Sequence, residues 1–128
     1  MRLIAALSVM LMLAACSQGT PPFQRFAPEG LWSGTWSGAG LADTNLTATI
    51  TATSSGWQAL FNSNNTTVTA ICTNPDDQGP TYLYCGAWSS AEVLVWEGDV
   101  RGGTWSGIWT YVSSGGNRGG GFTLFRTP

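Results

Sequence analysis

The sequence predicts one all-β domain over residues 30–128, an eight-stranded antiparallel up-and-down barrel. After residue 30, apolar and polar residues alternate with period two in short runs, and no run repeats at the helical period. Turn residues separate the runs so closely that neighbouring strands are expected to pair as hairpins. Closing such a sheet removes its exposed edges, which favours a barrel; a β-sandwich of the same strands is the alternative.

Each predicted strand is bounded by turn residues. The clearest is 46–53, in which apolar residues from Leu46 to Ala52 alternate with threonines. Aromatic and β-branched residues mark the others, and the glycine-rich stretch 113–121 is expected to be a loop. The predicted strands are 31–38, 46–53, 57–61, 66–73, 81–88, 92–100, 104–112 and 122–126.

The composition argues against several classes of function. The 128 residues include no histidine, which excludes Ser-His-Asp and Cys-His catalysis and any histidine-ligated metal. Five basic against seven acidic residues leave a net charge of −2, whereas nucleic-acid binding needs a basic surface. No nucleophile elbow, phosphate-binding loop or metal-ligand spacing appears. We therefore expect no enzyme, no catalytic residue, no metal and no cofactor.

Two groups of acidic residues are candidate sites. Asp76 and Asp77 stand in a Pro/Gly-bounded loop and are interpreted as a solvated turn, since a calcium loop would alternate its oxygen ligands. Glu97 and Asp99 share one face of a strand. They are interpreted as exposed rim charges, the alternative being a catalytic carboxylate pair.

The first 15 residues have the pattern of an export signal. Met1-Arg2 supplies a positive start, and an apolar run follows at 3–13. That run is too short to span a bilayer, which needs about 20 residues. Its length fits the apolar region of a secretory signal.

The run ends in Leu13-Ala14-Ala15-Cys16, which resembles a bacterial lipobox. The resemblance implies cleavage before Cys16, acylation of Cys16, and a bacterial envelope location, the outer membrane being favoured by Ser17. The alternative is an ordinary signal peptide with a chance cysteine. Residues 16–29 contain three prolines and are expected to form a tether, with one of its phenylalanines resting against the domain.

The unit Trp-Ser-Gly-X-Trp occurs twice, at 32–36 and 105–109. On a strand, its two indoles and the glycine share one face, where the glycine leaves a notch and permits the bend that a small barrel needs. The two units lie on the first and seventh strands, which flank the eighth in a closed barrel. The four indoles are interpreted as core or, alternatively, as a binding surface for a sugar ring or flat ligand. These residues are Trp32, Trp36, Trp105 and Trp109.

Gly34-Thr35-Trp36, entering the first strand of such a barrel, is similar to the avidin and lipocalin group, the calycins. The closing segment 119–126 also resembles the last strand of small bacterial lipoprotein barrels. The resemblance implies binding of a small ligand or, as in one lipoprotein-related branch, inhibition of a protease. No ligand-contacting residue of the group maps onto this chain.

Cys72 and Cys85 lie on consecutive predicted strands. If they face each other, Ile71 faces Gly86, and Ala70 faces Ala87. Small residues beside the pair leave room for a disulfide, which an exported protein retains. Closing this loop stabilises by roughly 3 kcal/mol in the chain-entropy model. The alternative is a pair of free buried thiols.

Together these features predict a lipid-anchored β-barrel of the bacterial envelope that binds a small ligand at the barrel mouth. A protein-interaction module, such as a protease inhibitor, and a purely structural envelope protein are the alternatives. Its expected partners are the membrane, through the lipid on Cys16, and a small ligand or envelope protein, but no nucleic acid.

Overall fold

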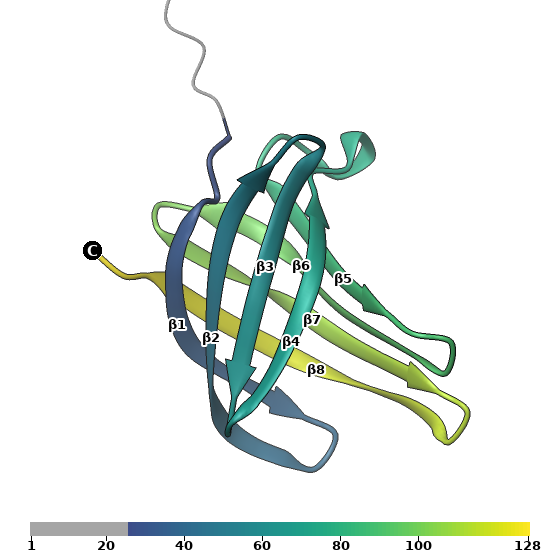
Figure 1. Ribbon diagram of the computed structural model, residues 1–128. Coiled ribbons are helices and arrows are strands. Elements are labelled where there is room, and N and C mark those ends of the chain that lie inside the picture. Colours follow the sequence, from purple (N-terminus) through teal and green to yellow (C-terminus); the bar gives the residue numbers. More distant parts are fainter. Residues whose placement is uncertain (1–25) are drawn as a thin grey trace, which may run out of the picture.

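The computed structural model describes residues 26–128; the predicted signal segment and Cys16 lie outside them. The eight strands form a closed antiparallel barrel in which β8 pairs with β1 (Figure 1). The predicted fold class is confirmed, and the sandwich alternative is wrong. The strands are β1 (Gly30–Gly38), β2 (Leu41–Thr53), β3 (Gly56–Ser63), β4 (Thr66–Thr73), β5 (Tyr82–Trp88), β6 (Glu92–Arg101), β7 (Thr104–Ser113) and β8 (Gly116–Arg126).

The prediction of a loop over the glycine-rich stretch 113–121 is wrong. Most of this stretch belongs to β8, which begins at Gly116. Only two residues separate β7 from β8, and their ladder runs unbroken from Ser113–Gly116 to Thr104–Phe125. The low strand propensity of glycine does not prevent a strand here, because both neighbouring strands pair with this segment. A Cβ on Gly120 would lie 1.9 Å from the Ser37 carbonyl oxygen, so β1 approaches too closely for any larger residue.

The barrel interior is filled by aromatic and aliphatic side chains. Phe61 stacks on Trp96 with ring centroids 3.8 Å apart, and Trp105 meets Phe122 edge to face at 4.9 Å. Among the described residues no polar or charged one is buried. The core is therefore held by apolar burial and ring packing.

Glycines let the strands that carry these rings bend inward. Gly107 lies opposite Gly98 on β6, and a Cβ on Gly107 would be 1.9 Å from the Glu97 carbonyl oxygen. Gly34, in the other Trp-Ser-Gly-X-Trp unit, would place its Cβ 1.9 Å from the Thr123 carbonyl oxygen. The central glycine of each unit thus permits a close approach of two backbones, a role that the sequence did not predict.

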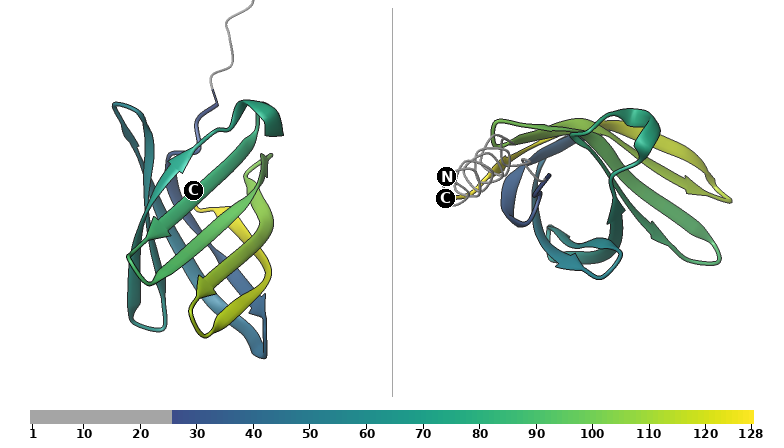
Figure 2. Two further views of the ribbon diagram at one scale, coloured as in Figure 1. Left: turned by 90° about the vertical axis from the view of Figure 1, so that its right-hand side faces the viewer. Right: turned by 90° about the horizontal axis from the view of Figure 1, so that it is seen from above.

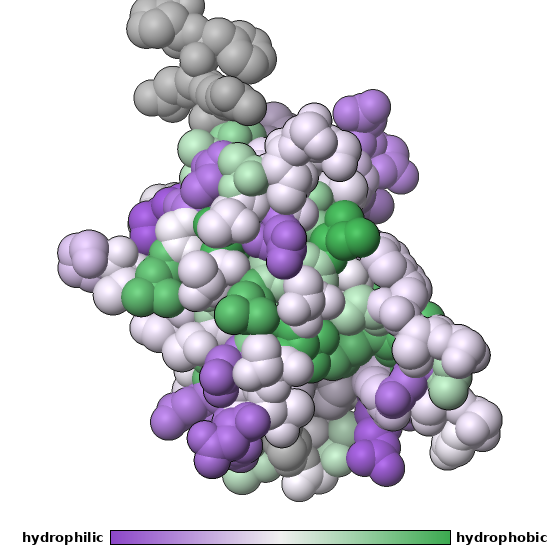
Figure 3. Space-filling model, in the orientation of Figure 1, coloured by the Kyte–Doolittle hydropathy of each residue, from purple (hydrophilic) through white to green (hydrophobic). Residues whose placement is uncertain are grey.

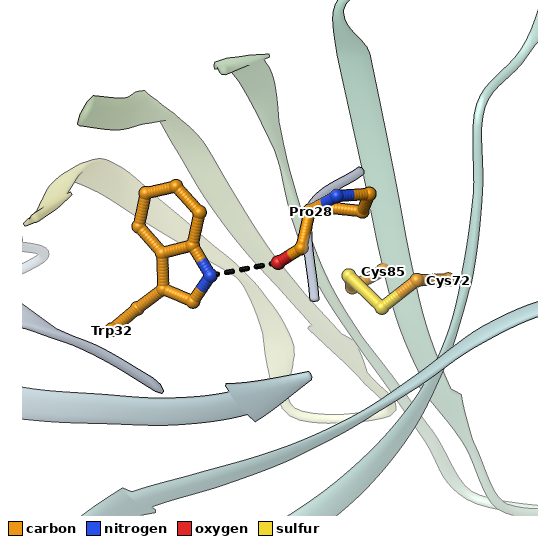
Figure 4. Close-up of a disulfide and its surroundings, with 4 residues drawn as sticks. All are labelled: Pro28, Trp32, Cys72 and Cys85. Carbon is orange, nitrogen blue, oxygen red and sulfur yellow. Dashed lines mark hydrogen bonds between the residues drawn. A yellow bond between two sulfur atoms is a disulfide. The ribbon is translucent and has the colours of Figure 1, made fainter. Parts of the chain in front are cut away.

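One end of the barrel is closed by the segment before β1. Pro28 is buried between Trp32 and the Cys72–Cys85 disulfide, and the Trp32 indole Nε1 donates to the Pro28 carbonyl at 2.9 Å (Figure 4). Phe26 packs edge to face on Trp57 with ring centroids 5.4 Å apart. Phe26 is thus the phenylalanine of the expected tether that rests on the domain.

Hydrogen bonds also hold residues 27–29, the segment before β1, against the barrel. The Trp57 indole Nε1 donates to the Glu29 carboxylate at 3.0 Å. The Arg126 guanidinium donates to the carbonyls of Ala27 and Glu29 and lies 4.5 Å from the centre of the Trp32 ring. The C-terminal strand therefore holds the chain just before the N-terminal strand, at the closed end.

The disulfide joins β4 to β5 in the predicted register. Cys72 faces Cys85 and Ile71 faces Gly86, and the two sulfur atoms are bonded. The expected Ala70–Ala87 pair is not formed, because the ladder stops at Ile71–Gly86 and β5 then diverges from β4 (Figure 2). Towards the other end of the barrel, this seam is open.

We predict that Gly107→Ala destabilises the domain by about 3 kcal/mol, the upper range for forcing extra atoms into a packed site. The added Cβ would overlap the Glu97 carbonyl oxygen. Gly121→Ala is the matched control, because a Cβ there has its nearest neighbour at 3.7 Å. Urea titration followed by circular dichroism measures both changes. Equal midpoints for the two variants would contradict the close-approach argument.

Candidate functional site

The end opposite Pro28 carries the hairpin turns β1–β2, β3–β4, β5–β6 and β7–β8 (Figure 1). A cavity of about 270 Å³ opens there, here called the mouth cavity. Its apolar lining is Trp36, Leu46, Phe61, Val68, Leu94 and Trp96. Its polar lining is Thr44, Ser63, Asn64 and Thr66. The cavity therefore offers an apolar wall with uncharged hydrogen-bonding groups.

Trp36 is held in a defined orientation in this wall. Its indole Nε1 donates to the Ser63 hydroxyl oxygen at 3.1 Å, and that hydroxyl donates to the Asn45 carbonyl at 2.7 Å. The ring also lies 5.2 Å from the Trp109 ring and 6.0 Å from the Trp96 ring, centroid to centroid. Contacts on several sides thus orient a half-buried indole at the cavity before any ligand arrives.

The structure separates the four candidate tryptophans into two pairs across β8. Trp32 and Trp105 meet edge to face at 6.4 Å near the closed end, and both are 0% exposed. Trp36 and Trp109 meet near the mouth, where they line a shallower hollow beside Tyr111. Trp109 is 6% exposed and donates from Nε1 to the Ser37 carbonyl at 2.8 Å. The gathering of indoles around β8 is confirmed, but only the mouth pair lies beside open space.

The cavity residues that the sequence analysis did not single out come from other strands. Phe61, Val68, Leu94 and Trp96 are inward positions of β3, β4 and β6. The period-two alternation assigns them to the inner face. Nothing in that pattern distinguishes the filled half of the barrel from the hollow half, because each position is simply apolar.

A second hollow of about 320 Å³ lies where β5 leaves β4. It is here called the β4–β5 gap and is lined by Val68, Ala87, Trp88, Ser89, Glu92, Leu94 and Tyr111. Val68 and Leu94 also line the mouth cavity, so the two hollows are neighbours. The Tyr111 hydroxyl donates to the Glu92 carboxylate, and this bond raises the pKa of Tyr111.

Glu97 and Asp99 of β6 lie on the outer wall. The Tyr82 hydroxyl donates to Glu97 at 3.0 Å, and the Thr81 hydroxyl donates to Asp99 at 3.1 Å. Burial and the hydrogen bond to Glu97 raise the pKa of Tyr82 to about 12. Asp76 and Asp77 are exposed in a short 3₁₀ turn, Asp76–Gln78. In the described part of the chain, no three potential ligand side chains gather as a metal site.

Comparison of the chain with protein-family models, with curated proteins and with solved structures finds no match. Within residues 26–128, no helix is long and apolar enough to cross a membrane.

We predict that Trp105→Ala lowers the free energy of unfolding by about 3–5 kcal/mol, the usual cost of emptying a large aromatic site. Trp36→Ala should cost only about 2 kcal/mol, because its half-buried ring faces an existing hollow and loses less burial. Denaturant titration by circular dichroism separates the two. An equal loss for both variants would mean that Trp36 is core and does not form an open wall.

Proposed function

We propose that this protein is a lipid-anchored, calycin-like barrel of the bacterial envelope that binds a small, largely apolar ligand in the mouth cavity. The observation that carries the proposal is the Trp36 indole, held by Ser63 and Trp109 beside a hollow. An indole fixed before binding costs little conformational freedom when a ligand packs on it.

The size and lining of the cavity indicate the class of ligand. A volume of about 270 Å³ suits a ring or a short acyl segment rather than a large cofactor. The apolar wall favours a flat or aliphatic group, and no charged residue stands among those lining the cavity. Asn64, Thr44 and Thr66 provide neutral donors and acceptors to a polar end. The ligand that fits best is therefore an uncharged molecule with one polar end.

The proposed lipid anchor would be attached at the closed end of the barrel, opposite the mouth cavity. The described chain begins at Phe26, which packs at the closed end. With a lipid on Cys16, the closed end would lie nearest the membrane and the mouth would face away from it. Support for the anchor comes from the lipobox resemblance of 13–16. Two or three acyl chains on one cysteine suffice for stable attachment.

We predict that the neutral fluorophore N-phenyl-1-naphthylamine binds the mouth cavity and that Thr44→Trp weakens this binding at least tenfold, or by about 1.4 kcal/mol. Thr44 lines the cavity, so a bulky ring there fills it. Probe fluorescence in a titration measures the affinity. Asn45→Trp is the matched control, because Asn45 is the next residue along β2 and is exposed. Equal binding by both variants would contradict the proposed site.

We predict that Cys16→Ser abolishes attachment to the membrane. The acyl chains of a lipoprotein are carried by this cysteine, and its hydroxyl replacement is expected to prevent their transfer. Metabolic labelling with a fatty acid, followed by membrane fractionation, measures the effect. Cys72→Ser with Cys85→Ser is the control, because it removes the two other cysteines and leaves Cys16 in place. Unchanged labelling of the Cys16 variant would refute the anchor without affecting the ligand proposal.

A further inference from the structure

One edge of β4 is open towards the mouth. β4 pairs with β3 along Thr66–Cys72 but with β5 only at Ile71, Cys72 and Thr73. Residues 66–70 therefore have a strand neighbour on one side only among the described residues. Figures 1 and 2 show the β5–β6 hairpin turning away from this stretch.

The disulfide determines which backbone groups face the opening. The Cα atoms of Cys72 and Cys85 are 4.0 Å apart, the close spacing of a non-hydrogen-bonded antiparallel pair. The Cys72 carbonyl accordingly points towards β3, where it would lie 2.7 Å from a Cβ on Gly56. Because this orientation alternates along a strand, the N–H and C=O groups of Thr67 and Thr69 point into the β4–β5 gap.

This edge lacks the usual features that prevent strands from pairing. Open edges are normally protected by lysine, proline, a bulge or an inward charge. Residues 66–70 are Thr-Thr-Val-Thr-Ala, all uncharged and mostly β-branched, and their pairing with β3 is regular. Such a segment has high strand propensity, and its outer edge can accept another strand.

The surroundings indicate what side chains a strand at this edge would carry. The inner side of the β4–β5 gap is apolar, with Val68, Ala87 and Leu94. On the outer face, Ile71 is 59% and Trp88 is 56% exposed. Figure 3 shows apolar surface in the lower right half of the view, where β5 diverges from β4. Among the residues that line the gap, Glu92 alone is charged.

We propose that the β4 edge binds an extended segment of a partner polypeptide, which adds a strand to β4. Main-chain hydrogen bonds to Thr67 and Thr69 provide the affinity, and apolar side chains opposite Val68 enter the gap. A lysine or arginine at the end of the segment pairs with Glu92, which selects a basic rather than an acidic peptide. The inference does not depend on the small-ligand proposal, since it uses backbone groups outside the mouth cavity.

The test uses the peptide acetyl-Thr-Val-Thr-Val-Thr-Lys-amide and amide hydrogen exchange measured by NMR. In the free protein the amides of Thr67 and Thr69 exchange fast, whereas those of Val68 and Ala70, which point towards β3, exchange slowly. Millimolar peptide should slow the Thr67 and Thr69 amides at least tenfold, or by about 1.4 kcal/mol. No protection at these two amides would overturn the proposal.

Backbone methylation supplies the matched control. N-methyl groups on the threonines of the peptide remove the N–H groups that face β4 and should abolish protection. N-methyl groups on the valines, whose N–H groups point away from β4, should leave it. Equal behaviour of the two methylated peptides would overturn strand addition and indicate apolar adsorption only.

A variant of the protein completes the test. Thr69→Pro removes one N–H that faces the gap and is tolerated on an edge strand; it should weaken peptide binding at least tenfold, or by about 1.4 kcal/mol. Thr69→Val keeps the N–H and should bind normally. Far-UV circular dichroism and slow exchange of the Val68 and Ala70 amides show that both variants are folded, so this control needs no ligand in the mouth cavity. Protection of Thr67 and Thr69 that rises with protein concentration without peptide would instead assign the edge to a second copy, against the proposal.

Discussion

The barrel depends on glycines that lie between the inward-pointing indoles along its strands and let neighbouring backbones approach each other. Seven tryptophans have to be placed in a small domain, and six of them lie in the core or pack against it; the exception is Trp88, which is 56% exposed. Trp109 faces Gly120 across β7 and β8, and Gly98 faces Gly107. The strands between the large rings approach each other until only a hydrogen atom fits in place of a side chain. Large and small residues must therefore alternate in register, which is how a small closed barrel fills its interior.

Much of this arrangement can be predicted from the alternation of residues. Period two assigns the inner face of every strand, short turns impose hairpins, and closure places the first and seventh strands beside the eighth. The facing of Cys72 and Cys85 follows from loop length and from the small residues around them. Local pattern suffices in these cases because a one-residue slip would move every apolar side chain to the outside.

Other features depend on packing in three dimensions, which the alternation of apolar and polar residues does not reveal. The stretch 116–121 is a strand although its glycines have low strand propensity. The β1 backbone lies so close to Gly120 that only glycine fits there. Trp36 and Trp105 hold equivalent positions in the alternation, yet one lines a cavity and the other is fully buried. The distinction lies in the neighbours of each ring: Trp105 packs against Trp32, Phe61 and Phe122, whereas Trp36 lines the mouth cavity. The alternation of residues along the strands does not reveal these neighbours.

The two ends of the barrel therefore differ in character. At one end, Pro28, Trp57 and Arg126 close the interior with hydrogen bonds and ring contacts. At the other end, two hairpins diverge and leave apolar walls beside open space. The closed end thus fixes the positions of the strands, and the hollows lie where the strands diverge.

The position of the disulfide has a topological consequence. β4 and β5 share three paired positions, fewer than any other two neighbouring strands, and Cys72–Cys85 is the middle one. Backbone hydrogen bonds alone would let this seam part and turn the cylinder into a curled ribbon with two additional edges. The sulfur bridge closes a covalent ring of residues 72–85 and ties β4 to β5 close to their connecting loop. Further along, towards the mouth, the two strands are not paired. The seam with the fewest backbone pairs is thus the one that carries the covalent link.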